Sequence, residues 1–235
     1  MNTYRKNAII VGVLFIIGTG APLLSFLFSG FIPGDPNYLV NISANENKVI
    51  IGTLLELAYG FAVAGIAIWM YPVLKKHNQA LALWSVAFRL IEGILYIVAV
   101  IGLLSLVTLS QEFVKAGAPD TSYFQSLGTL LLAARDWCGS VGSITFILGA
   151  LIYYYIFFKS KLIPRWLSVW GLIGVPLWIV AALLLMFGLV EPFSTSVILL
   201  DIPIAINEMV LAVWLIVKGF NSSAIASLSA KTDIN

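Results

Sequence analysis

Histidine and cysteine are almost absent from this chain, which has one of each in 235 residues. The single histidine, His77, lies in a predicted turn, KKHNQ, between two apolar segments. A bis-histidine haem, a histidine zinc site within the membrane and a Ser-His-Asp triad are excluded, because each needs imidazole where this chain has none. The lone Cys138 excludes an internal disulfide and a cysteine-held metal cluster. We therefore expect no metal and no cofactor.

Charged residues are also scarce. Asp, Glu, Lys and Arg make up 10% of the chain, against about a quarter in ordinary soluble domains. Hydrophobic residues make up 60%, and the mean hydropathy is +1.01. This composition indicates a membrane protein whose main partner is the lipid bilayer. The formal net charge is only +2, and the chain has no clustered basic face of the kind that binds nucleic acid.

The apolar residues fall into six long segments. A helix that crosses a bilayer needs about 20 mainly apolar residues, and six segments meet this length: 7–29, 49–71, 80–109, 124–157, 166–190 and 194–217. The third and fourth are longer than a bilayer requires, so we expect them to tilt or to project into solvent at one end. The sequence thus predicts an all-α, polytopic bundle of six transmembrane helices.

The basic residues predict how this bundle is oriented. Outside the predicted spans, one side of the membrane has nine of them: Arg5, Lys6, Lys75, Lys76, Lys159, Lys161, Arg165, Lys218 and Lys231. The other side has only Lys48 and Lys115. Because basic loops stay in the cytoplasm, we expect both termini to be cytoplasmic. We expect one transmembrane domain over residues 1–220 and a polar, disordered cytoplasmic tail over residues 221–235.

Seven ionisable residues lie inside the predicted spans, and they form the candidate ligand-binding or ion-binding site: Glu56, Arg89, Glu92, Arg135, Asp136, Asp201 and Glu208. Each costs about 2.5–3.5 kcal/mol at the centre of a membrane helix, so leaving all of them in lipid would cost on the order of 20 kcal/mol. We expect them to face one another or water. The first and fifth spans have no ionisable residue, and we expect those two to cover the other four on the lipid side.

The spacing of these residues suggests how they pair. Arg89 and Glu92, in the segment FRLIEGILY, are three residues apart and share one face of a helix. Because Glu56 and Glu208 come from other spans at compatible depths, we expect Arg89 to form an ion pair across helices with one of them. Five acids oppose two arginines, so we expect at least one acid to keep its proton at neutral pH, with Glu208 as the leading candidate.

Small and aromatic residues accompany the charges. Arg135 shares a helical stripe with Gly128 and Gly142 at seven-residue spacing, which favours close helix packing or leaves room for a partner side chain or a ligand. Five aromatic residues near the cytoplasmic boundary are typical of an interfacial aromatic belt: Tyr153, Tyr154, Tyr155, Trp166 and Trp170.

Four segments resemble a family of bacterial membrane proteins with a domain of unknown function, DUF4386: RKNAIIVGVLFIIG, FRLIEGILY, ARDWCGS and PIAINEMVLAVWLIVKGF. The resemblance covers nearly the whole chain. It implies a multi-pass bundle in the bacterial cytoplasmic membrane, with a polar centre built from Arg89, Glu92, Arg135, Glu208 and Lys218. It implies no particular activity.

Three functions fit these residues. The first is the binding or translocation of a small solute, a proton or a cation by the acidic cluster. The second is an enzyme acting on a lipid or isoprenoid, with two carboxyl groups from among Glu56, Asp201 and Glu208 as general acid and base. The third is a non-catalytic scaffold or accessory subunit that associates with a second copy of itself or with another membrane protein.

Overall fold

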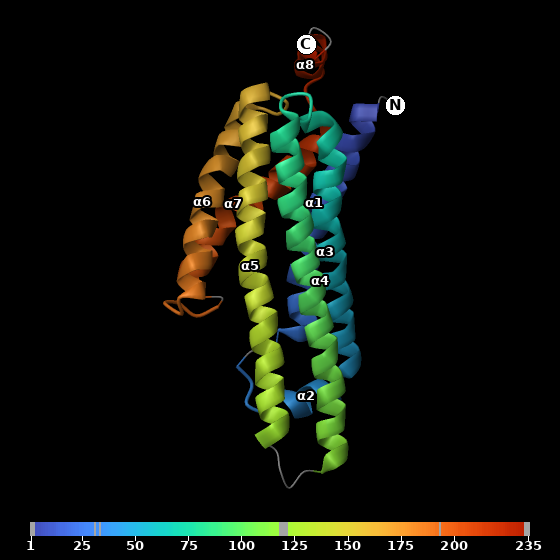
Figure 1. The fold of residues 1–235 in the computed structure, drawn as a ribbon, viewed down its shortest axis with the longest axis vertical. Helices are drawn as coiled ribbons and strands as arrows, with labels where there is room; N and C mark the ends of the chain where they lie inside the picture. The colour runs from blue at the N-terminus through green and yellow to red at the C-terminus, as the bar shows by residue number, and fades with distance from the viewer. Residues whose placement is uncertain (1–2, 31, 33, 118–121, 193, 233–235) are drawn as a thin grey trace.

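The computed structural model describes residues 3–30, 32, 34–117, 122–192 and 194–232, and this part of the chain contains helices and no strand (Figure 1). The helices are α1 (Thr3–Ser29), α2 (Tyr38–Ala44), α3 (Glu46–Leu74), α4 (Gln79–Ala116), α5 (Ser122–Ser160), α6 (Arg165–Met186), α7 (Thr195–Val217) and α8 (Ser222–Thr232). Within the described residues, six of them are long and apolar enough to cross a membrane: α1, α3, α4, α5, α6 and α7. The predicted all-α bundle of six spans is confirmed.

The six long helices form a closed ring. In chain order each packs against the next, and α7 packs back against α1. The main apolar core fills this ring with buried side chains such as Phe15 of α1, Met70 of α3 and Leu211 of α7. We expect α1 and α6 to lie towards lipid, and with 28% of each span buried they are among the least buried of the six, together with α7. Both are members of the ring, however, and not a cover over the other four helices.

Two helices extend well beyond the others. At 1.5 Å per residue, α4 (38 residues) and α5 (39 residues) are about 57 and 58 Å long, whereas α6 (22 residues) is about 33 Å long. A bilayer core is about 30 Å thick, which α6 matches. The excess length of α4 and α5 lies past the end of α6, at the end of the molecule where α2 lies (Figure 1).

The short helix α2 seals this projecting end. Leu39 and Ile42 of α2 form a second apolar cluster with Leu103 and Leu106 of α4. The Ser110 hydroxyl of α4 donates a hydrogen bond to the Leu39 carbonyl. An apolar contact and a satisfied carbonyl together fix α2 on α4, so the segment between α1 and α3 is anchored to the bundle.

The opposite end contains the start of α1, the α3–α4 and α5–α6 turns, and α8 (Figure 1). We expected the tail to be disordered, but residues 222–232 form α8. Asn221 starts this helix: its side-chain oxygen accepts from the Ser223 amide at 3.1 Å, and its own amide donates to the Leu162 carbonyl at 2.9 Å. Ile225 then packs into the main core. The cap at Asn221 and the apolar side chain of Ile225 therefore attach α8 to the bundle, although the segment is polar in composition.

The orientation of this bundle remains a prediction that reporter fusions can test. Because the basic connections all lie at the end with α8, fusions after Lys76, after Lys161 and at the C-terminus should report the cytoplasm. Fusions within residues 30–47 and 111–122 should report the outside. A cytoplasmic signal from either of the last two sites would contradict the predicted topology.

Candidate functional site

The opposite charges of FRLIEGILY pair with each other at the centre of the ring. Arg89 Nη1 lies 2.9 Å from Glu92 Oε2, and the two side chains are only 2% and 0% exposed. Tyr59 of α3 donates a hydrogen bond of 2.8 Å to the other Glu92 oxygen. The Arg89 guanidinium lies over the ring of Phe146 in α5, 5.1 Å from its centroid, an attractive cation–π arrangement. Side chains from three helices thus enclose one ion pair.

Glycines of α5 make room for these side chains. A Cβ atom at Gly149 would lie 3.0 Å from Arg89 Cγ, so the arginine stem passes directly over this glycine. Seven residues earlier, Tyr96 of α4 fills the space beside Gly142 in the same way. Gly142 of the predicted small-residue stripe, and Gly149 seven residues later, therefore seat α4 side chains, whereas Gly128 of the stripe lies against Tyr38 of α2. Both contacts fit the close-packing interpretation of these glycines.

The predicted cross-helix ion pair of Arg89 is wrong. Residues three apart on one helix have Cβ atoms about 5–6 Å apart, so Glu92 reaches Arg89 without help from another helix. Glu56 lies too far along the bundle: α3 packs on α4 where Gly60 meets Gly93, which places Glu56 opposite residue 97, about 12 Å along α4 from Arg89. Glu208 lies near enough to interact electrostatically with Arg89 but forms no ion pair with it.

Tyrosines of α5 hold the polar groups of α7. Tyr153 donates a hydrogen bond of 3.1 Å to Glu208 Oε1, and Tyr154 donates one of 2.5 Å to the Asn207 side-chain oxygen. Asn207 in turn donates to the Leu167 carbonyl of α6 at 3.0 Å. Both tyrosines are 0% exposed, so the aromatic-belt interpretation is wrong for them. Tyr155 is 43% exposed, as a belt residue would be.

The sequence holds a clue to Tyr153 that we did not use. It lies four residues after Gly149, on the face of α5 that receives Arg89, so helical spacing alone places it beside the charged centre. We call Tyr59, Arg89, Glu92, Tyr153 and Glu208 the central cluster.

A second group of charges, the outer pair, lies nearer to α2. Arg135 Nη2 of α5 is 2.5 Å from Glu56 Oε1 of α3, and the two side chains are 26% and 14% exposed. Ser25 of α1 donates to the same Glu56 oxygen at 3.1 Å. The room that the sequence predicted around Arg135 is thus occupied by Glu56, a partner side chain.

The remaining candidate residues lie outside both groups. Asp136 is exposed on α5, beside Arg135 in sequence. Asp201 is half-buried on α7, and its Oδ1 atom has no hydrogen-bond partner among the residues that the structure describes. Lys218, which the family resemblance placed in the polar centre, is exposed at the end of α7. The structure therefore brings together five of the seven predicted residues, in two groups.

Contacts with α6 give the depth of the central cluster. Phe146, which stacks on Arg89, also contacts Trp178 of α6 with ring centroids 5.4 Å apart. Trp178 is the fourteenth of the 22 residues of α6, the helix whose length matches the bilayer core. The central cluster thus lies near the middle of the membrane, where an uncompensated charge is most costly.

The two groups differ in their charge balance. The outer pair has one carboxylate and one guanidinium, whereas the central cluster has two carboxyl groups, Glu92 and Glu208, for one guanidinium. Arg89 Nε also forms no hydrogen bond or ion pair within the described part of the chain. The guanidinium therefore has one N–H, that of Nε, available for a second acceptor. The cluster also has a surplus acid that can hold or release a proton.

Comparison with known proteins identifies the family. The family described as Domain of unknown function (DUF4386) matches residues 10–219. The chain belongs to this family. No curated protein and no solved structure matches the chain. The matched residues of this DUF4386 protein include most of α1 and all of the other five long helices, so the central cluster and the outer pair both lie within the family domain.

Substitution of Arg89 tests whether the ion pair is as buried as described. Arg89→Ala strands the Glu92 carboxylate in the core, and breaking a buried pair in this way costs about 3–5 kcal/mol. The double variant Arg89→Ala/Glu92→Gln removes the stranded charge and should recover part of this loss. Unfolding of the purified protein in detergent measures both, with Lys6→Ala, an exposed residue on α1, as the control expected to change stability by less than about 0.5 kcal/mol.

If Arg89→Ala were as stable as Lys6→Ala, the pair would not be a buried one. A double variant less stable than Arg89→Ala would show that the stranded carboxylate is not the source of the loss.

Proposed function

We propose that this DUF4386 protein binds a proton at Glu208 and moves protons across the membrane through the centre of the ring. One observation supports this proposal above the others: at mid-membrane depth, two carboxyl groups share one guanidinium. With both carboxyl groups ionised the cluster would have a net negative charge in a low-dielectric core, and a bound proton removes that charge. Ionisable residues within membrane helices commonly form proton relays.

The surplus proton is best assigned to Glu208. Glu92 lies against Arg89 at 2.9 Å and accepts a second contact from Tyr59, so both of its oxygens face groups that stabilise the charged form. Glu208 accepts one hydrogen bond, from the neutral hydroxyl of Tyr153. The carboxyl group with the weaker set of partners is the one that loses least by staying neutral.

Polar side chains continue from this cluster towards the outer pair. The Tyr96 hydroxyl interacts with Tyr59, which bonds Glu92, and also with Ser143 of α5. Tyr96 is in turn near enough to interact electrostatically with Glu56 of the outer pair. Hydroxyl groups both donate and accept hydrogen bonds, so they can pass a proton from one neighbour to the next. These residues supply a route between mid-membrane and the end where α2 lies.

The other two functions have less support. An enzyme that uses two carboxyl groups needs both within reach of one substrate, yet Glu92 is fully buried beneath Tyr59 and Asp201 lies two turns from Glu208 along α7. A protein whose charges serve only to hold helices together needs only ion pairs in which each acid has one basic partner. The outer pair fits that role, whereas the surplus acid of the central cluster does not.

Proton flux in liposomes tests the proposal. The purified protein is reconstituted with a pH-sensitive dye inside, and a potassium diffusion potential drives protons inward. Wild type should acidify the interior faster than empty liposomes, and Glu208→Gln, which fixes the neutral form, should lower the initial rate at least tenfold. Glu112→Gln is the matched control, because Glu112 is an exposed acid paired with Lys115 outside the cluster, and it should behave as wild type.

Two outcomes would overturn the proposal. One is wild-type flux equal to that of empty liposomes when the protein is shown to be folded. The other is equal flux through wild type and Glu208→Gln.

A further inference from the structure

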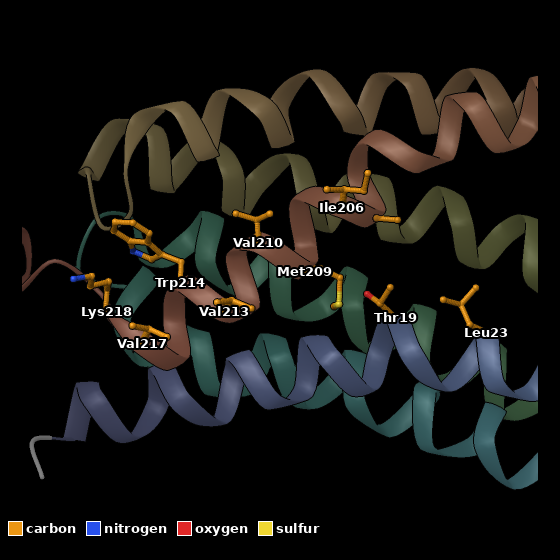
Figure 2. A pocket seen from close by; sticks show the side chains of 10 residues that line it. Thr19, Leu23, Ile206, Met209, Val210, Val213, Trp214, Val217 and Lys218 are labelled. Carbon is orange, nitrogen blue, oxygen red and sulfur yellow. The ribbon is translucent and has the colours of Figure 1, made fainter.

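An apolar groove runs along the outside of the ring between α1 and α7 (Figure 2). It has a volume of about 640 Å³, within the range of small-molecule sites. Thr19 and Leu23 of α1 point towards it from one side, and residues 205–218 of α7 supply the rest of its lining. Apart from Thr19 and Lys218, every lining residue is apolar or aromatic. The groove is separate from the central cluster, none of whose residues line it.

The groove has the length of a lipid chain. From Ala205 to Lys218, α7 advances 13 residues, or about 20 Å. Half of a bilayer core is about 15 Å thick, so the groove extends from the membrane surface at the Lys218 end past the middle of the bilayer. A chain of a phospholipid in that leaflet covers the same depth.

Only one end of the groove is charged. Lys218 lies at this end next to Trp214 (Figure 2), is exposed, and belongs to none of the ion pairs in the described part of the chain. Arg5 adds a second cation close by, since its guanidinium donates to the Leu215 carbonyl at 3.0 Å and to the Ile216 carbonyl at 2.5 Å. No acidic residue lines the groove. The Arg5 guanidinium is engaged by the two α7 carbonyls, so Lys218 is the charge left for a ligand. An apolar channel that ends in a lysine without an ion-pair partner among the described residues complements an amphiphile with an anionic head.

We propose that this groove binds one acyl chain of an anionic phospholipid, with the lipid phosphate on Lys218. The lipid comes from the leaflet at the end of the molecule that contains α8. The apolar lining supplies the affinity for the chain, and Lys218 supplies the preference for an anionic head group over a zwitterionic one. The tryptophan beside Lys218 contacts the head-group region, where indole rings are favoured. This inference is independent of proton transfer through Glu208.

Quenching of Trp214 fluorescence tests the inference. The full-length protein is reconstituted into phosphatidylcholine vesicles that contain increasing fractions of brominated phosphatidylglycerol or brominated phosphatidylcholine. The chain has seven tryptophans, so the Trp214 contribution is the difference between wild type and Trp214→Phe. Phosphatidylglycerol should reach half-maximal quenching at a mole fraction about fivefold lower than phosphatidylcholine, which corresponds to about 1 kcal/mol for one basic residue near an anionic lipid.

Variants of two exposed lysines at the same end of the molecule distinguish lipid binding in the groove from a general attraction of anionic lipid to this basic face. Lys218→Gln should abolish the fivefold preference, whereas Lys159→Gln, on α5 away from the groove, should keep it. A second variant, Val213→Phe, fills the exposed middle of the groove without adding a tryptophan and should weaken the quenching of Trp214 by both lipids. Equal quenching by the two lipids in wild type, or an equal loss in Lys218→Gln and Lys159→Gln, would overturn the proposal.

Discussion

The contact on which this bundle depends is the Arg89–Glu92 ion pair, enclosed at mid-membrane depth. Two charges withdrawn from water are costly unless they pair with each other and with attractive neighbouring groups. The ring meets this demand from three sides, with the Tyr59 hydroxyl on the carboxylate, the Phe146 ring under the guanidinium and the absent side chain of Gly149 beside the arginine stem. Each requirement fixes a neighbour of α4, so the pair sets how α3 and α5 pack on it.

Much of this architecture follows from the sequence, because the length and polarity of a span are local properties. The six helices, their long third and fourth members and the ionisable residues within them could all be predicted from segments of about 20 residues. Partners across helices could not, since these depend on how far one helix is displaced along another. Glu56 was expected near Arg89, but the crossing of Gly60 and Gly93 places it with Arg135.

The hydroxyl and amide groups of the site were missed for a related reason. Tyr153 and Tyr154 are of a residue type that is common in interfacial belts, and they lie near the end of a span. Only the direction of each side chain distinguishes a belt residue from one that binds Glu208 or Asn207. Helix α8 was missed because its polar composition hides a single capping residue, Asn221, and a single docking residue, Ile225. In both cases the structure depends on one or two individual contacts, and the composition of a segment does not reveal them.

The outer pair and the central cluster have different roles, one structural and one chemical. The outer pair is balanced and links α3 to α5, with Ser25 adding α1, so it serves to hold helices together. The central cluster has an acid more than its arginine can neutralise, and Glu208 is the member with the weakest set of partners. A neutral Glu208 balances the cluster, and an ionised one draws a positive charge towards the middle of the membrane.

The protonation state of Glu208 is therefore the most direct test of this account. Infrared difference spectra of the carboxyl stretch, recorded as pH is varied and compared between wild type and Glu208→Gln, observe it directly. Wild type should show a protonated carboxyl band at neutral pH that is absent from Glu208→Gln. A Glu208 that is already ionised at an acidic pH of about 5, close to the usual range of a glutamate, would contradict it and leave the central cluster as a salt-bridged scaffold.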